Sequence, residues 1–354
     1  MKNLAATYQH IADILSYDSD ASTLESTLSQ PAFNWDVIVK EGSKHLVLPA
    51  IFCRLQSKQL LHVLPADLLS YLENITELNR NRNSSILNQM QSISDLLKQN
   101  HINHVFLKGA ALLVSNIYED PAERMIGDID ILIDLNQLDE TFELFIKEGY
   151  NPIEQTFGNK FSEHKHLPRL TTEKYICAVE LHRKLFVNHK DVALENANIL
   201  KTKTNINQFY IPNEQHLLRH NILNYQINDK GQLYNSLNFR SSFDTITLLK
   251  KRTLHLNFEE NNTIKNYFRV LSIFFKEIRP DTTIKYNIKS SFYLFKLKNL
   301  KFYRFWNALL RITNYLLSLT NRIPLFLYNK AYRKEFLADR KRIYQHFVTI
   351  LKGS

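Results

Sequence analysis

The segment GDIDILI, residues 127–133, constrains the fold of this chain more than any other. Side chains two residues apart in a β-strand point to the same face, so Asp128 and Asp130 project together while the isoleucines beside them project to the opposite face. The segment is therefore predicted to be a strand with one buried apolar face and one acidic face. Two neighbouring carboxylates repel each other unless a cation lies between them. A hard divalent ion such as Mg²⁺, which prefers oxygen ligands, is the usual solution.

Two glycines flank this region in a chain that has seven among its 354 residues. Gly109 follows the apolar segment HVFL and precedes a helical segment, where backbone amides and a helix N-terminus can approach a phosphate with no side chain in the way. Lys108 adds a positive charge at the same turn. Gly127 is expected to let the chain turn tightly into the acidic strand. The two glycines are therefore predicted to shape a phosphate site next to the carboxylate pair.

A second acidic strand is predicted in AVELHRK, where Glu180 would add a third carboxylate if this strand lies beside Asp128 and Asp130. Three carboxylates on neighbouring strands can hold two metal ions, Mg²⁺ or Mn²⁺. His182 shares a strand face with Glu180 and is expected either to contact substrate or a carboxylate, or to pack the end of the strand. Arg124 precedes the carboxylate pair by four residues and is either a triphosphate contact or a surface arginine.

The spacing of apolar residues divides the chain into three predicted regions. Residues 1–100 have apolar residues at helical spacing and are predicted to form a helical N-terminal module. Residues 101–205 alternate between strand and helix patterns and are predicted to form an α/β core, in which Gly149 is the C-cap glycine of a helix. Residues 206–354 are predicted to be helical again, with a basic and aromatic-rich tail.

The composition is that of a soluble globular protein, with 44% hydrophobic and 23% charged residues. Its two cysteines, Cys53 and Cys177, are far apart and lack metal-ligand spacing, which fits a reducing compartment and argues against a zinc site. The N-terminal residues lack the layout of a signal peptide, and no stretch offers the roughly 18 uncharged apolar residues that a membrane span needs. The sequence therefore predicts a cytoplasmic protein.

The positive charge of the chain belongs to its C-terminal part. Residues 281–354 have fifteen basic and three acidic residues, whereas residues 1–280 carry a net charge of −2. Lysine and arginine alternate with aromatic residues in this tail, and three interpretations follow. The tail is either a helical cap on the core, a surface for RNA or a tRNA end, or a basic amphipathic element on an anionic membrane. The helical cap is the favoured interpretation, and RNA is favoured over membrane.

Residues 34–250 resemble the uncharacterised nucleotidyltransferase family of the DNA polymerase β-like superfamily. The resemblance rests on Trp35 with KHLVLPAIF, on HVFLKGAALL followed by GDIDILI and EGY, and on HKHLPRL, VELH and the later segment HLLRHNI. It implies an α+β fold, in which a polymerase β-like nucleotidyltransferase core (a small mixed sheet with helices) is flanked by N-terminal and C-terminal helical regions. It also implies transfer of a nucleoside monophosphate from an NTP, with two metal ions held by three carboxylates.

The resemblance assigns roles by position. The site residues that it implies are Asp128, Asp130 and Glu180 as catalytic residues and metal ligands, and Lys108, Gly109, Arg124 and His182 as nucleotide-binding residues. This sequence departs from the wider superfamily after Gly109, where Ala110 and Ala111 replace the glycine or serine often found there. A hydroxyl contact to phosphate is therefore missing from this turn.

Together, these features predict a metal-dependent nucleotidyltransferase, an enzyme that moves an NMP from an NTP to a hydroxyl acceptor and releases pyrophosphate. The acceptor is RNA or tRNA, a protein or a small molecule, and the residues leave this choice open. The alternative is a catalytically weak or inactive nucleotide-binding regulatory protein, whose basic tail binds nucleic acid or a membrane.

Overall fold

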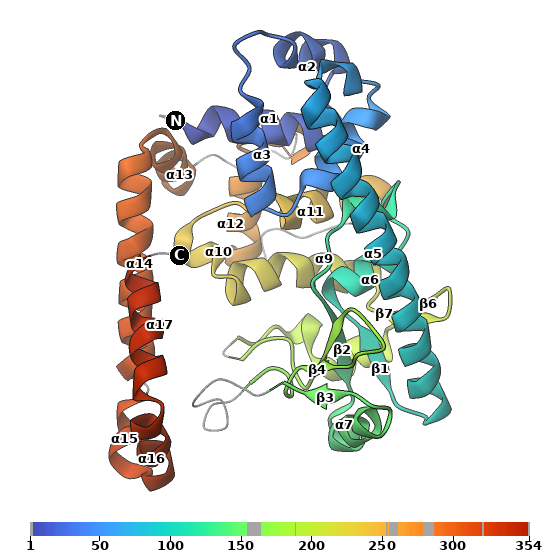
Figure 1. Cartoon of the computed structure of the whole chain (residues 1–354), viewed down its shortest axis with the longest axis vertical. Helices are drawn as coiled ribbons and strands as arrows, with labels where there is room; N and C mark the ends of the chain where they lie inside the picture. The colour runs from blue at the N-terminus through green and yellow to red at the C-terminus, as the bar shows by residue number, and fades with distance from the viewer. Residues whose placement is uncertain are drawn as a thin grey trace.

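The computed structural model describes residues 3–153, 164–187, 189–252, 254, 261–278, 287–320 and 322–352. A small sheet lies at one end of the molecule, helices cover the other end, and a long helical arm from the C-terminal region lies along one side (Figure 1). This mixed architecture confirms the predicted α+β fold class.

The N-terminal region is helical, as its apolar spacing predicts. Its helices are α1 (Leu4–Leu15), α2 (Ala21–Leu28), α3 (Trp35–Lys44), α4 (Leu48–Ser57) and α5 (Ala66–Gln99). Pro49 lies in the first turn of α4 and Pro65 is the N-cap of α5, positions where the missing amide hydrogen of proline costs no helical bond. One face of α5 buries Ile86, Met90 and Ile93, and the long helix runs down to the sheet (Figure 1).

Five strands form the sheet, in the order β1 (His104–Phe106), β2 (Asp128–Ile133), β5 (Ala178–His182), β4 (Leu170–Thr171) and β3 (Asn151–Pro152). Strand β2 pairs antiparallel with β1 and parallel with β5, and the remaining pairs are antiparallel. The parallel register places Asp130 opposite Glu180 and Asp128 opposite Ala178. The expectation that the strand of Glu180 lies beside the carboxylate pair is therefore confirmed.

Two helices connect the strands of the sheet. Helix α6 (Lys108–Val114) follows β1, and α7 (Leu138–Lys147) follows β2. Gly149 ends α7 with φ +85°, and the amides of Gly149 and Tyr150 donate to the carbonyls of Ile146 and Phe145. The rings of Phe145 and Tyr150 pack with centroids 5.0 Å apart. This is a Schellman motif with its hydrophobic contact, and it confirms the predicted C-cap glycine.

The glycine expected to turn the chain tightly does not have a special conformation. Gly127 has no positive φ, and a Cβ built on it would meet nothing within 4 Å. The left-handed residue is Lys108, with φ +50°, at the turn from β1 into α6. The tight-turn prediction for Gly127 is therefore wrong, because the chain enters β2 at residues 125–127 without a turn. Lys108, whose side chain pairs with Asp130, is the residue that carries backbone strain in this region.

After the sheet the chain becomes helical again. The further elements are α8 (Asn196–Lys201), a hairpin of β6 (Thr204–Ile206) and β7 (Phe209–Ile211), α9 (Glu214–Leu223), α10 (Gly231–Tyr234), α11 (Phe239–Lys251), α12 (Asn262–Leu271), α13 (Ile288–Lys298), α14 (Leu300–Thr320), α15 (Ile323–Tyr328), α16 (Lys330–Ala338) and α17 (Arg340–Lys352). The hairpin was not predicted, because strands of three residues show too little alternation. It packs on β1, where the rings of Phe209 and Phe106 lie 5.8 Å apart.

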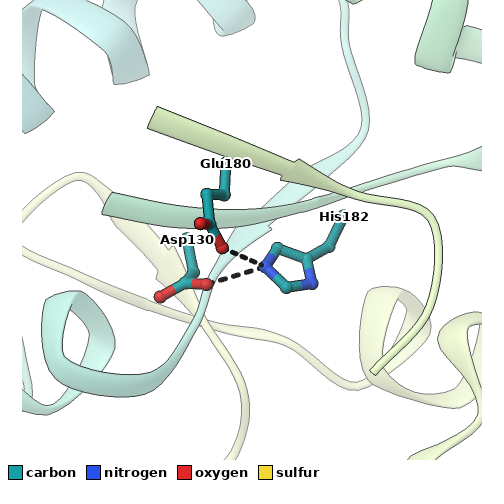
Figure 2. Close-up of side chains that lie close together, drawn as sticks. All are labelled: Asp130, Glu180 and His182. Carbon is teal, nitrogen blue, oxygen red and sulfur yellow. Dashed lines mark hydrogen bonds and ion pairs between the residues drawn. The ribbon is translucent and has the colours of Figure 1, made fainter. Parts of the chain in front are cut away.

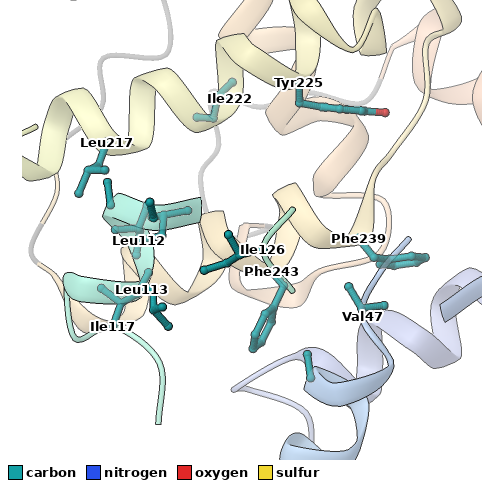
Figure 3. Packing of buried hydrophobic residues seen from close by; sticks show 14 of the residues in the cluster. Val47, Leu112, Leu113, Ile117, Ile126, Leu217, Ile222, Tyr225, Phe239 and Phe243 are labelled. Carbon is teal, nitrogen blue, oxygen red and sulfur yellow. The ribbon is translucent and has the colours of Figure 1, made fainter. Parts of the chain in front are cut away.

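One apolar cluster joins the three predicted regions. Helix α6 contributes Leu112, the helices after the sheet contribute Leu217 and Phe243, and the N-terminal helices meet them at Val47 (Figure 3). Phe239 at the start of α11 packs against the same junction through Tyr8, with ring centroids 5.0 Å apart. The helical regions therefore support the α/β core directly, and the three-part division of the chain stays a prediction.

We expect Gly149→Ala to lower the free energy of unfolding by about 1 kcal/mol, because an alanine side chain disfavours a left-handed backbone. Gly149→Asn should cost less, since asparagine tolerates this conformation better. Urea unfolding followed by circular dichroism would measure both changes. Equal stability of the alanine variant and the wild type would contradict the role of Gly149 as the helix C-cap.

Candidate active site

Three carboxylates gather where β2 and β5 run side by side. Asp128 and Asp130 project from β2, and Glu180 projects from β5 directly opposite Asp130. Asp130 is almost fully buried, Glu180 is buried, and Asp128 is half-buried. The alternation of β2 therefore places the acids on one face, as predicted, while its isoleucines enter the core.

Asp130 is the most strongly held of the three acids. Its Oδ1 atom accepts hydrogen bonds from the Lys108 ammonium and from Nε2 of His182, the latter at 2.7 Å. Burial alone would raise the pKa of the Asp130 carboxyl, but Lys108 and His182 hold this pKa well below its usual value. In return, Asp130 keeps the pKa of Lys108 above its usual value in spite of burial. The pair is therefore fully ionised at neutral pH.

Asp128 and Glu180 both pair with Arg169, a residue that the sequence analysis did not identify. Nη2 of Arg169 donates to Oδ2 of Asp128 at 2.5 Å, and its Nε donates to Oε1 of Glu180 at 3.3 Å. Burial, followed by repulsion from Asp130 and Glu180, nevertheless raises the pKa of Asp128. Arg169 lies in the segment HKHLPRL, and only the pairing of β4 with β5 brings it to the acids.

His182 is fully buried and lies between two of the acids. Figure 2 shows its Nε2 atom facing both carboxylates, at 2.7 Å from Asp130 and 3.6 Å from Glu180. Of the two roles expected for His182, contact with a carboxylate is the one that the structure shows. His166 also reaches this cluster, with Nε2 3.5 Å from Glu180 and its ring centroid 5.2 Å from that of His182.

A cavity opens beside the carboxylates. Lys108, Gly109, Asp128 and Asp130 line its side nearest the sheet. The opposite side is built by α9, α11 and the segment between them, with the polar residues His220, Asn221, Asn224, Asp229, Asn238, Arg240 and Ser241. The predicted phosphate turn and the carboxylate pair therefore border a single cavity, which the sequence could not show.

Arg124 is a buried residue and not the surface arginine that was one of its two interpretations. Its Nε donates to the Asp244 carboxylate at 2.9 Å, and the hydroxyl of Tyr118 donates to the same carboxylate at 2.6 Å. Arg124 also lines the cavity, and its Nη2 would lie 3.7 Å from a Cβ built on Gly109. Asp244 therefore fixes the guanidinium beside the predicted phosphate turn, and a nucleotide contact by Arg124 stays a prediction.

Arg240 is a second arginine of the cavity, on the first turn of α11. Within the part of the chain that the structure describes, its guanidinium has no hydrogen-bond or salt-bridge partner. Burial, and then repulsion from Arg124, lowers its pKa from the usual value. Burial of a guanidinium without a partner is unfavourable, so Arg240 is a candidate for binding an anion.

The residues of the cluster fit a divalent cation. One ligand atom each from Asp130, Glu180 and His182 lie within 4.8 Å of one another, and Asp128 adds a further carboxylate on the same face. The raised pKa of Asp128 shows that the acids repel one another even with Lys108 and Arg169 beside them. Carboxylate oxygens in this number suit Mg²⁺ or Mn²⁺ better than a softer metal.

A small mixed sheet with paired acids on one strand, a third acid on the parallel neighbour and a lysine-glycine turn beside them defines a nucleotidyltransferase-like protein. The model of the family described as uncharacterised nucleotidyltransferase matches residues 31–265, and the chain belongs to this family. The predicted resemblance is thereby confirmed. The segments HKHLPRL, VELH and HLLRHNI all fall inside the matched residues.

A solved structure also matches, and its title is "Crystal structure of an antigenic nucleotidyltransferase-like protein from Paracoccidioides brasiliensis". It is 19% identical in sequence, covers 57% of this chain and 91% of its own, and superposes with a TM-score of 0.37. No curated protein matches the chain.

We expect the two aspartates of β2 to affect stability in opposite directions. At pH 7.5 with a chelator present, Asp128→Asn should raise Tm by about 1–3 °C, because it removes a carboxylate whose ionisation is opposed by burial and by its neighbours. Asp130→Asn should lower the stability by on the order of 3 kcal/mol, since it leaves the buried Lys108 without its counter-ion.

The effect of Asp128 on the stability of the fold depends on pH. The folded-state pKa of Asp128 is raised, so its unfavourable contribution grows as pH rises above the usual pKa of aspartate, about 4. The advantage of Asp128→Asn should therefore shrink as pH is lowered toward that value. Differential scanning calorimetry of both variants would measure these effects, and changes of the same sign in both would contradict the assignment of charges.

Proposed function

We propose that this protein is a metal-dependent nucleotidyltransferase that moves an NMP from an NTP to a hydroxyl acceptor. The observation that carries the proposal is the position of Asp128 and Asp130, with Glu180 directly opposite Asp130, at one side of a cavity that Arg240 lines from the other side. Acids that hold a divalent cation next to unpaired positive charge match a triphosphate with its metal ions.

In the proposed reaction, an acceptor oxygen attacks the α-phosphorus of the NTP. A new oxygen–phosphorus bond forms, the bond to the leaving oxygen breaks, pyrophosphate departs, and the acceptor proton passes to solvent or a nearby base. Asp128, Asp130 and Glu180 would hold the Mg²⁺ or Mn²⁺, which supplies electrophilic activation of the phosphate and neutralises its charge. Positioning and charge stabilisation account for most of the catalysis in such transfers.

The residues around the acids serve to position them. Nε2 of His182 donates to Asp130 and fixes the rotamer of this carboxylate, in the manner of an outer-shell histidine. Lys108 and Arg169 balance the acids of the free protein, and both can turn to a phosphate when metal ions take over this role. Because Gly109 has no side chain, the backbone at the start of α6 is accessible from the cavity. The next residue, Ala110, is buried in the core.

The proposal is tested by a transfer assay with each α-labelled NTP, in the presence of Mg²⁺ or Mn²⁺. Total RNA, protein extract and the enzyme itself serve as acceptors, and Asp128→Ala/Asp130→Ala is the control. We expect metal-dependent incorporation of label that the control loses, because the carboxylates can no longer hold the ions. Nucleotide binding without incorporation into any acceptor would favour the regulatory alternative, and equal incorporation by the control would overturn the proposal.

Arg240 provides a separate test of the nucleotide position. We expect Arg240→Ala to raise KM for the NTP about ten-fold or more, which corresponds to the loss of one charged hydrogen bond to a phosphate. Thermal unfolding of the free variant should be unchanged or improved, since Arg240 has no described partner to lose. Lys250→Ala, which removes an exposed cation from the same helix, is the matched control. Equal KM values for the two variants would exclude Arg240 from the nucleotide site.

A further inference from the structure

The C-terminal arm, residues 300–352, consists of α14, α15, α16 and α17 and stands apart from the helices around the sheet (Figure 1). Helix α14 is 21 residues long and has no buried residue, whereas α13 before it is anchored in the body. Lys296 of α13 donates to the carbonyls of Tyr234 and Asn235, and the hydroxyl of Tyr293 accepts from the amide of Leu237. The predicted helical cap on the core is therefore limited to α13 and the start of α14, where Leu300 and Tyr303 pack against the core cluster.

The tip of the arm is a folded helical hairpin. The rings of Phe326 in α15 and Phe336 in α16 lie 5.2 Å apart, and Tyr332 is buried between the helices. Arg333 donates to the carbonyls of Phe326 and Leu327 at the end of α15. The conformation of the tip is thus held by its own contacts, and the side chains that point outward do so in a defined arrangement.

Those outward side chains are aliphatic to an unusual degree. In α15, Ile323 is 53% exposed, Leu327 is 55% exposed and Tyr328 is 87% exposed. The stripe continues along α14, where Leu316 and Leu317 are also more than half exposed. A contiguous group of exposed aliphatic residues marks a surface that binds an apolar partner.

Basic residues surround this apolar surface. The arm contains eleven lysines and arginines and two acidic residues, and Arg322, Lys330 and Lys334 lie exposed at its tip. Among the helices that the structure describes, none has the length and apolar character needed to cross a bilayer. An apolar surface with a basic border on a helix that does not span is the pattern of an element that lies in the interface of an anionic membrane.

The exposed aliphatic side chains of the arm favour a membrane over a nucleic acid. The rings of Phe292, Phe302 and Trp306 pack together at centroid distances of 5.4 to 6.1 Å and join α14 to α13, so these aromatic residues serve packing. Other aromatic residues of the arm, such as Tyr328, are exposed, but leucines and isoleucines are the more numerous among its exposed large side chains. Leucine and isoleucine enter acyl chains but do not stack on bases.

We propose that the tip of the C-terminal arm docks the protein on the surface of an anionic lipid bilayer. The apolar side chains of α15 enter the boundary between headgroups and acyl chains, and Arg322, Lys330 and Lys334 pair with lipid phosphates. This inference does not rest on the proposed nucleotidyltransferase activity, whose candidate site lies beside the sheet and not in the arm (Figure 1).

The test is sedimentation of the full-length protein with vesicles of phosphatidylglycerol and phosphatidylcholine, and with vesicles of phosphatidylcholine alone. We expect binding to the anionic vesicles that weakens in high salt. Leu327→Glu should reduce the partition coefficient at least about ten-fold, because a leucine that would enter the bilayer is replaced by a charge. Lys330→Glu/Lys334→Glu should reduce it by a similar factor on anionic vesicles. Leu135→Glu, which changes an equally exposed leucine in the sheet region, should leave binding unchanged.

Several outcomes would overturn the proposal. No binding of the wild type to anionic vesicles at low salt is the first, and equal effects of Leu327→Glu and Leu135→Glu are the second. A concentration-dependent dimer that Leu327→Glu dissociates, seen by analytical ultracentrifugation, would identify the tip as an interface between copies of this chain. RNA binding that the lysine variant abolishes and Leu327→Glu leaves intact would identify an RNA surface. Circular dichroism of each variant confirms that the arm remains folded.

Discussion

The parallel pairing of β2 with β5 is the constraint on which the rest of this molecule depends. It places Glu180 and His182 beside Asp130, and the further pairing of β5 with β4 brings Arg169 to the same acids. A shift of one residue in this register would turn Glu180 toward the core and separate the acids. The apolar face of β2, which enters the core at Ile129 and Ile131, makes such a shift unfavourable. Packing on one face of the sheet thus fixes the chemistry on the other.

The free protein carries its acids at a cost that its own cations offset in part. Lys108 compensates Asp130 almost fully, whereas Arg169 compensates Asp128 only in part, so the pKa of Asp130 is lowered and that of Asp128 is raised. Lys108 adopts a left-handed backbone to reach its partner, which concentrates strain at the turn next to Gly109. The two aspartates of β2 therefore differ in the direction of their pKa shifts. A cation would stabilise the ionised form of Asp128, the more exposed of the two, more than that of Asp130.

The local spacing of apolar residues was sufficient to predict the elements in which this spacing is regular. The helical character of the N-terminal region, the strand of Asp128 and the C-cap at Gly149 were all predicted, because each depends on contacts within a few residues. The hairpin of β6 and β7, the partner of Arg124 and the position of Arg169 were not, since each depends on pairing between distant segments. The candidate acids could be named from the sequence, but the cavity beside them could not.

Basic side chains in the cavity and in the C-terminal arm lie in different electrostatic environments. In the cavity, arginines meet buried acids, and the fixed pair of Arg124 with Asp244 leaves Arg240 as the guanidinium available for an anion. In the arm, basic side chains have few acids near them and stay exposed beside aliphatic residues. Burial strengthens the electrostatic interactions of the cavity cations, whereas water and salt screen the exposed charges of the arm, so that each of these charges attracts an anion weakly and over a short distance. The proposed membrane docking therefore depends on both the apolar side chains of α15 and the basic side chains beside them.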